Sequence, residues 1–144
     1  MIYLDSCALV KLVREEAESS ALRRFLDEHA DLESVTSELA RTEVVRVVRR
    51  ANHDPHGRLT VAQEAFAAQL AEARAVLAEV DQVTIGPELL DRAGAIEAPY
   101  LRTLDAVHLA SALALGLGLR WFVTYDKGLR SAAEAIGLAV VSPA

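Results

Sequence analysis

Short apolar runs alternate with longer amphipathic stretches along the whole chain. The short runs predict β-strands at 2–4, 32–35, 82–85, 121–124 and 138–141. In the longer stretches apolar residues recur three and four positions apart, which predicts helices at roughly 6–14, 17–30, 38–51, 61–79, 87–97, 104–116 and 127–136. Alternating strands and helices favour a mostly parallel sheet covered on both faces. We therefore expect an α/β fold, a three-layer α/β/α sandwich with a central sheet of about five strands.

Local residues support several of these boundaries. Thr60 and Gln63 have the spacing of a capping box at the start of a helix. Gly118 and Gly137 are typical of C-terminal helix stops just before the next strand. The segment 52–58 contains proline and glycine and predicts a loop between two long helices.

Composition favours one domain without a membrane segment. With 144 residues, 52% of them apolar, the chain can bury one substantial core, so we expect a single domain over residues 1–144. No basic leader and no apolar run of about 18 residues is visible, which predicts a cytoplasmic protein without a membrane partner. The lone Cys7 excludes an internal disulfide and a multi-cysteine zinc site. A net charge of −6 opposes loose binding to a polyanion unless bound cations supply local positive charge.

Three aspartates stand where predicted helices begin. Asp5 and Asp126 each separate a strand from the helix that follows, and Asp105 lies in the opening turn of an almost wholly apolar helix. Each has an ordinary structural explanation, because aspartate caps helix N-termini and complements the helix dipole. The helix around Asp105 is so apolar that its carboxylate should be shielded from water. It then needs a hydrogen bond, a basic partner such as the nearby Arg102, or a bound cation.

A glutamate faces the apolar side of its helix. At about 100° per residue, Glu43 projects into the stripe that contains Val44 and Val48, away from the polar face that carries Glu38. A core glutamate paired with an arginine is the structural alternative, since glutamate is rarely buried alone.

Together the four carboxylates predict a metal site. In an open parallel sheet the ligand crevice lies beyond the carboxyl ends of the strands, where Asp5 and Asp126 are placed. Four carboxylates at close range repel each other unless cations neutralise them, and oxygen ligands suit Mg²⁺ or Mn²⁺ better than zinc. Asp5, Glu43, Asp105 and Asp126 therefore predict a divalent-metal site for phosphoryl transfer.

Four segments follow one another in the order and approximate spacing of a known family. They are MIYLDSCALVKL, SELARTEVVRVVRR, LRTLDAVHLASAL and FVTYDKGL. With these segments the chain resembles the PIN-domain ribonucleases, particularly the VapC toxins of bacterial type II toxin–antitoxin systems. Together with the intervening helix pattern, the resemblance spans essentially the whole chain.

The resemblance assigns the acidic catalytic and metal-binding set to the same four carboxylates. By similarity, Thr124 would lie beside the site and help to orient a ligand or water. Ser6 either contributes a hydroxyl to the site or serves as a helix-entry residue. The family often has serine or threonine at the position of Cys7, which we interpret here as a small buried residue that leaves the chemistry unchanged.

The family's properties imply a Mg²⁺- or Mn²⁺-dependent endoribonuclease. A metal-activated water would hydrolyse RNA and leave a 3′-hydroxyl and a 5′-phosphate, while a VapB-type antitoxin would inhibit a homodimeric toxin. Arg46, Arg49 and Arg50 either contact RNA phosphates or complement the dipole of their helix. The apolar side chains of 17–30 and 61–79 either receive an amphipathic partner helix or cover the sheet.

Three other functions compete with this interpretation. A haloacid-dehalogenase-like phosphohydrolase would use Asp5, but it needs a second acid where this chain has Cys7. A hydrolase built on Cys7 and His108 has no identifiable oxyanion hole or third group, and it leaves Glu43 unexplained. A PIN fold that only binds is disfavoured by the presence of all four acids.

Overall fold

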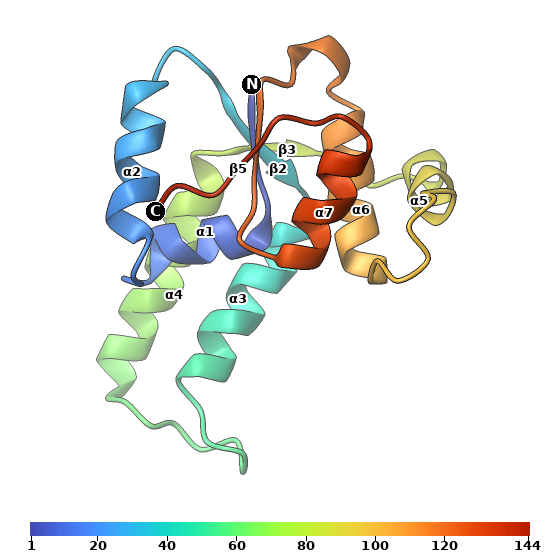
Figure 1. Cartoon of the computed structure of the whole chain (residues 1–144). Coiled ribbons are helices and arrows are strands. Elements are labelled where there is room, and N and C mark those ends of the chain that lie inside the picture. Colours follow the sequence, from blue (N-terminus) through green and yellow to red (C-terminus); the bar gives the residue numbers. More distant parts are fainter.

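Five short parallel strands form the centre of the protein in the computed structural model, which describes residues 1–144 (Figure 1). The strands are β1 (Ile2–Leu4), β2 (Ser34–Ser37), β3 (Asp81–Val83), β4 (Trp121–Val123) and β5 (Val140–Val141). The helices are α1 (Ser6–Val13), α2 (Ser19–Glu28), α3 (Ala40–Ala51), α4 (Gln63–Ala78), α5 (Pro87–Gly94), α6 (Thr103–Leu113) and α7 (Lys127–Ala135), with a 3₁₀ turn at Gly116–Gly118.

The sheet order is β3-β2-β1-β4-β5, so β1 is the central strand. Every strand pairing is parallel; Ile2, for example, is in register with Ser34 on one side and Trp121 on the other. The chain builds outward from β1 to β3, then returns to the opposite side of β1 for β4 and β5. This reversal creates a switch point between β1 and β4, the position where open α/β sheets bind ligands.

Alternating side chains of β1 enter two separate cores. Ile2 and Leu4 pack with α1, α2, α3 and α4 on one face of the sheet. Tyr3 points to the other face, where it packs with Phe122 of β4 and with α6 and α7. Helices α5 and α6 share a further apolar cluster. The predicted three-layer sandwich is confirmed, because helices cover both faces of an all-parallel sheet.

Some predicted element ends are wrong. Strand β2 begins and ends two residues later than expected, because it includes hydroxyl side chains such as Thr36, whose Oγ1 donates to the carbonyl of Leu4. The capping box does not form, since α4 starts at Gln63 without a side-chain cap. Helix α6 ends at Leu113, and Gly118 closes a separate 3₁₀ turn. Gly137 does follow α7 as expected, with a left-handed φ of 83°.

The apolar faces of α2 and α4 pack into the larger core. Leu22, Phe66 and Leu77 are buried in the larger core, and the neighbouring apolar residues of both helices pack against it. The structure therefore shows internal packing for both faces, and reception of a partner helix by their partly exposed residues stays a prediction.

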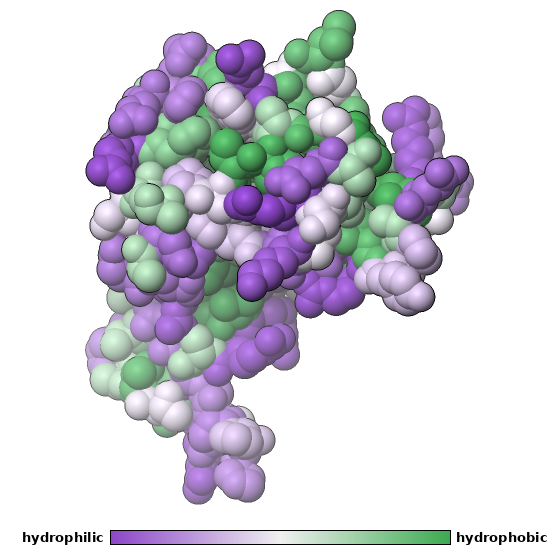
Figure 2. Space-filling model, in the orientation of Figure 1, coloured by the Kyte–Doolittle hydropathy of each residue, from purple (hydrophilic) through white to green (hydrophobic).

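The surface is mostly hydrophilic on the face drawn in Figure 2, including the projecting end of the α3–α4 hairpin. Exposed apolar side chains include Leu117, in the turn after α6, and Tyr100. No helix has both the length and the hydropathy that crossing a bilayer requires.

Candidate active site

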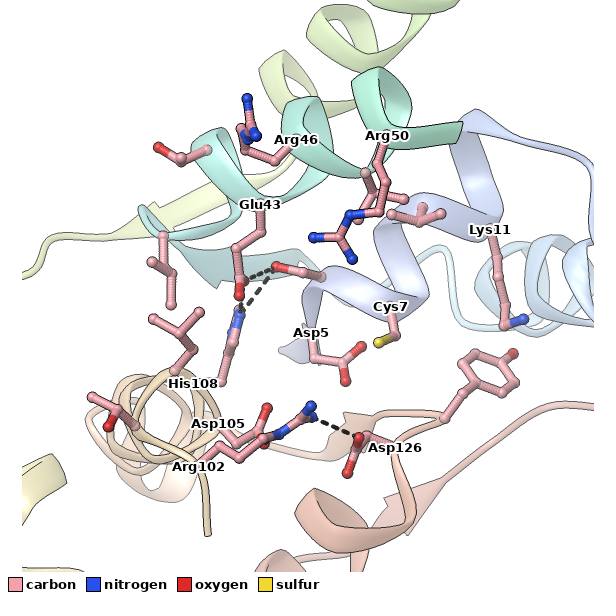
Figure 3. Close-up of a pocket in the computed structure, with 18 of the residues that line it drawn as sticks. Asp5, Cys7, Lys11, Glu43, Arg46, Arg50, Arg102, Asp105, His108 and Asp126 are labelled. Carbon is pink, nitrogen blue, oxygen red and sulfur yellow. Dashed lines mark hydrogen bonds and ion pairs between the residues drawn. The ribbon is translucent and has the colours of Figure 1, made fainter. Parts of the chain in front are cut away.

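A cleft of about 850 Å³ opens at the carboxyl ends of β1 and β4, at the switch point of the sheet. All four predicted carboxylates line it, each from a different segment of the chain. The lining residues with polar or charged side chains that matter here are Asp5, Ser6, Cys7, Lys11, Glu43, Arg46, Arg50, Arg102, Asp105, His108 and Asp126 (Figure 3).

Asp5 is the most deeply buried of these acids, with 2% of its surface exposed. It directly follows β1 and caps α1, since one carboxylate oxygen accepts the backbone N–H of Ala8 at 2.8 Å. The other oxygen accepts the hydroxyl of Thr124. Burial raises the pKa of Asp5 to about 6, although both hydrogen bonds oppose the rise. Because no basic side chain pairs with it, an ionised Asp5 favours a nearby cation.

Glu43 lies at the end of a hydrogen-bonded chain that starts at Tyr3 of β1. Its Oε2 accepts from Ser6 Oγ and lies 2.7 Å from Nε2 of His108, while Nδ1 of His108 lies 2.8 Å from the hydroxyl of Tyr3. Burial raises the pKa of Tyr3 well above its usual value, so the hydroxyl keeps its proton. An ionised Glu43 can only accept, so the Nε2–H group of His108 donates to it, and in this neutral tautomer Nδ1 accepts the hydroxyl of Tyr3.

These bonds also set the charge of Glu43. Burial alone would raise the pKa of its half-buried carboxyl, but the bonds from His108 and Ser6 outweigh burial and hold the pKa below its usual range. Glu43 is therefore an ionised carboxylate in a fixed orientation. The partner that the sequence suggested for a core glutamate was an arginine; the structure places a histidine there.

Asp105 and Asp126 share a single cation. Nε of Arg102 donates to Asp105 at 2.7 Å, and the Nη2 group donates to Asp126 at 2.8 Å. Arg102 immediately precedes α6, and its side chain is 72% exposed, compared with 15% for Asp105 and 27% for Asp126. The hydrogen bond to Asp105 is the main cause that raises the pKa of Arg102. Asp126 also caps α7, by accepting the N–H of Leu129.

The chemistry of the donor set fits a hard divalent cation. The four carboxylates offer only oxygen atoms, and the Arg102 guanidinium already lies between two of them as a positive group. The side chains do not yet converge on one point, since no three His, Cys, Asp or Glu groups are close enough to hold one ion. In this arrangement two carboxylates are turned toward Arg102 and two toward hydrogen-bond donors.

The two proposed supporting residues both contact the acids. Thr124 is fully buried and links two of them, because its hydroxyl donates to Asp5 and accepts the backbone N–H of Asp126. Ser6 donates to Glu43 and so does more than open helix α1. The predicted burial of Cys7 is wrong: it lies in the first turn of α1 with its side chain exposed to the cleft.

Sequence reasoning missed the positioning role of Tyr3 and His108. In the sequence, Tyr3 has the pattern of an ordinary apolar strand residue, and His108 is a candidate only as a partner for Cys7. The available signal was that His108 and Glu43 each interrupt an apolar helix face, which favours pairing between them.

Comparisons with known proteins identify the family of this chain. A PIN-domain profile matches residues 2–135. Ribonuclease VapC35 of Mycobacterium tuberculosis strain H37Rv is 41% identical over 145 residues, covering 99% of this chain and 97% of that protein. Ribonuclease VapC46 of the same strain is 42% identical over 142 residues, with the same two coverages.

Solved structures share the fold at low identity. VapC20 of M. tuberculosis, described as a sarcin-ricin loop cleaving toxin, has a TM-score of 0.69 at 18% identity and covers 99% of this chain and 100% of its own. VapBC2 of Rickettsia felis, bound to a DNA fragment from its promoter, has a TM-score of 0.68 at 12% identity, with full coverage of both chains. From the profile match and the two relatives above 40% identity, this chain belongs to the PIN-domain family, among the VapC ribonucleases.

Proposed function

We propose that this chain is the toxin of a VapBC pair and hydrolyses RNA with Mg²⁺ or Mn²⁺ held by Asp5, Glu43, Asp105 and Asp126. The observation that carries the proposal is that these four carboxylates, from four separate segments, line one cleft at the switch point of the sheet. VapC ribonucleases with a PIN domain generally depend on divalent metals, and the oxygen donor set here agrees with that requirement.

Some residues of the cleft would hold a cation, and others keep those residues oriented and ionised. A bound cation supplies a water of lowered pKa and offsets the negative charge that develops on the phosphate. Asp5 and Glu43 are held by hydrogen bonds before any ligand arrives, so their oxygens need little reorganisation. Thr124 keeps Asp5 oriented, and His108 keeps Glu43 ionised and directed into the cleft.

The competing enzymatic interpretations lack support. A haloacid-dehalogenase-like phosphohydrolase would need a second acid at position 7, where this chain has Cys7. Partial burial in the cleft and the surrounding carboxylates raise the pKa of the Cys7 thiol to about 12, so the nucleophilic thiolate is scarce at neutral pH. The His108 ring also forms hydrogen bonds with Tyr3 and Glu43 and none with Cys7.

The wider biology follows from family membership and is also proposed. We infer that the chain forms one domain, works in the cytoplasm as a homodimer without a membrane partner, and is inhibited by a VapB-type antitoxin. The structural neighbour described as VapBC2 supports a toxin–antitoxin pair. The size of the purified protein by light scattering, with and without a co-expressed antitoxin, tests the assembly.

Incubation with RNA tests the activity. Purified, antitoxin-free protein is mixed with total cellular RNA in Mg²⁺ or Mn²⁺, and new 5′ ends are sequenced, with parallel reactions in EDTA. Asp105→Asn should abolish the metal-dependent cuts. Asp27→Asn is the matched control, because Asp27 is exposed on α2 and lies outside the cleft. Equal cutting by wild type and Asp105→Asn, or equal silence with no metal bound, would overturn the proposal.

A further inference from the structure

Helix α3 forms one wall of the cleft and presents two arginines along it. Arg46 and Arg50 are one helical turn apart, both line the cleft, and both are exposed. Neither side chain takes part in an intramolecular hydrogen bond or ion pair. Figure 3 shows the Arg50 guanidinium pointing toward Asp5 and Cys7, whereas Arg46 points away from them. This wall therefore carries positive charge that the fold itself does not use.

The other two basic side chains of the cleft are already paired. Lys11 contacts Glu16 at 2.8 Å and Glu18 at 2.7 Å. Arg102 bridges the two aspartates of α6 and α7, as described above. Arg46 and Arg50 are thus the two cations of the cleft that remain free to bind an anion.

A third arginine on the same helix points elsewhere. Arg49 lies between the other two in sequence, but it does not line the cleft, and its guanidinium lies 5.7 Å from the centre of the Phe66 ring of α4. The dipole of α3 would favour all three cations near its C-terminus. The dipole alone therefore does not explain why Arg46 and Arg50, and not Arg49, face the cleft.

We infer that Arg50 and Arg46 bind phosphate groups of the RNA strand and guide it along α3 to the four carboxylates. This inference rests on the proposed ribonuclease function. A chain with a net charge of −6 repels RNA at long range, so local cations are needed beside the acidic centre. The guanidinium suits this task, because its N–H groups form paired hydrogen bonds with phosphate oxygens. Arg50, which points inward, is the principal contact.

Binding measurements on one catalytically silent background test the inference. A short, fluorescein-labelled, single-stranded RNA of mixed sequence is titrated with Asp105→Asn protein in Mg²⁺, across a series of salt concentrations, by fluorescence anisotropy. Adding Arg50→Gln should weaken binding about tenfold at low salt and reduce the slope of log K against log salt by about 0.7, the value for one phosphate contact on a single strand. Arg46→Gln should have a smaller effect in the same direction.

Arg49→Gln is the matched control, since it removes the same charge from the same helix outside the cleft. It should bind RNA like its parent, and Arg50→Lys should retain most of the salt slope. In the otherwise wild-type enzyme, Arg50→Gln should raise the KM for RNA more than it lowers kcat. Thermal unfolding of every variant checks that the fold is kept.

The outcomes separate this inference from the proposed function. If wild type cuts RNA with metal but Arg50→Gln and Arg49→Gln bind equally well, the inference is wrong and the function stands. If Arg50→Gln weakens only the complex with the co-expressed antitoxin, the α3 wall is a protein-docking surface and the inference is also wrong. If wild type cuts no RNA under any metal condition, the proposed function itself fails.

Discussion

The two halves of the acidic cleft are held in different ways. In the inner half, Asp5 and Glu43 are fixed by hydrogen bonds from buried or half-buried donors. In the outer half, Asp105 and Asp126 are held by Arg102, whose side chain is 72% exposed. The inner half is therefore organised by the core of the fold. The outer half is held mainly by the two ion pairs of Arg102, although Asp126 also caps α7.

This difference bears on how readily each half can adapt to a ligand. Exposed ion pairs contribute roughly 0–1 kcal/mol and weaken with salt, so an incoming cation can replace Arg102 at little cost. Leaving a buried donor or acceptor unpaired costs about 1–3 kcal/mol, so the inner half resists rearrangement. We expect the inner acids to keep their places when metal binds and the outer acids to turn toward it.

Asp5→Asn should have the largest effect on activity. It replaces an inner carboxylate by a neutral group of the same shape, and several kcal/mol of charge stabilisation, about a thousandfold in rate, should be lost. Single-turnover cleavage of RNA measures the loss. Cleavage within a few-fold of wild type would show that the inner half is not part of the catalytic centre.

The same substitution should stabilise the metal-free protein at neutral pH. The folded-state pKa of Asp5, about 6, lies above the ordinary value near 4, so the folded chain binds the proton more tightly than the unfolded chain. Its contribution to stability is therefore fully present below about pH 4, is lost as pH rises through about 6, and stays lost above that. In EDTA, the Tm advantage of Asp5→Asn over wild type should grow from about pH 4.5 to about pH 7.5. An advantage that does not change with pH would contradict this assignment.

Tyr3→Phe tests the inner half without touching a carboxylate. Removing the hydroxyl leaves Nδ1 of the buried His108 without its donor, so the ring no longer presents a fixed N–H to Glu43. Loss of such an outer partner of a metal ligand costs about 10- to 100-fold in activity or metal affinity. Mn²⁺ binding by calorimetry and single-turnover cleavage are the measurements.

The matched control is Tyr100→Phe, because Tyr100 is 98% exposed. A merely structural role for Tyr3 would lower Tm while leaving Mn²⁺ affinity and the cleavage rate of the folded protein unchanged. That outcome would remove Tyr3 and His108 from the description of the site.

The fold could be predicted because its signals are local. Apolar periodicity placed all five strands and seven helices within a few residues, and errors arose where tertiary contacts decide an end. In β2, for example, the side chain of Thr36 donates a hydrogen bond to the carbonyl of Leu4, a tertiary contact that local sequence does not predict.

The acids of the site could be predicted for the same reason, but their partners could not. Asp5 and Asp126 can be found from local sequence, because each lies between a predicted strand and a predicted helix. The hydrogen bond between Tyr3 and His108 joins residues 105 positions apart, so no local pattern predicts it. Which side of the sheet Tyr3 faces depends on the register of β1 in the assembled sheet. The double pairing of Arg102 likewise requires α6 and α7 to pack side by side.

Arg102→Gln should have a smaller effect than the substitutions above, and it should raise the affinity for metal where they lower it. Removing the cation that competes for Asp105 and Asp126 should raise Mn²⁺ affinity by up to about fivefold, the equivalent of about 1 kcal/mol. Calorimetric titration with Mn²⁺ measures it. Arg92→Gln is the control, because it breaks an exposed ion pair with Glu88 away from the cleft. A fall in affinity would mean that Arg102 orders the outer half for metal.

Substitution of Cys7 should have the smallest effect on activity, yet the reactivity of its thiol reports the charge of both halves of the cleft. Cys7→Ser should leave cleavage within about twofold, because serine has nearly the same size and the Cys7 thiol, partly buried in the cleft, makes no hydrogen bond. In EDTA its thiolate is scarcer, on the order of a thousandfold, than that of free cysteine at about pH 8, so iodoacetamide should react slowly. The pKa of the thiol is raised by burial and then by carboxylates of both halves, so Mn²⁺ that neutralises these carboxylates should speed alkylation.

In Arg102→Gln the metal-free alkylation of Cys7 should be slower still, since one nearby positive charge is gone. Alkylation at the rate of free cysteine in EDTA would show that the four carboxylates do not act together on this point of the cleft.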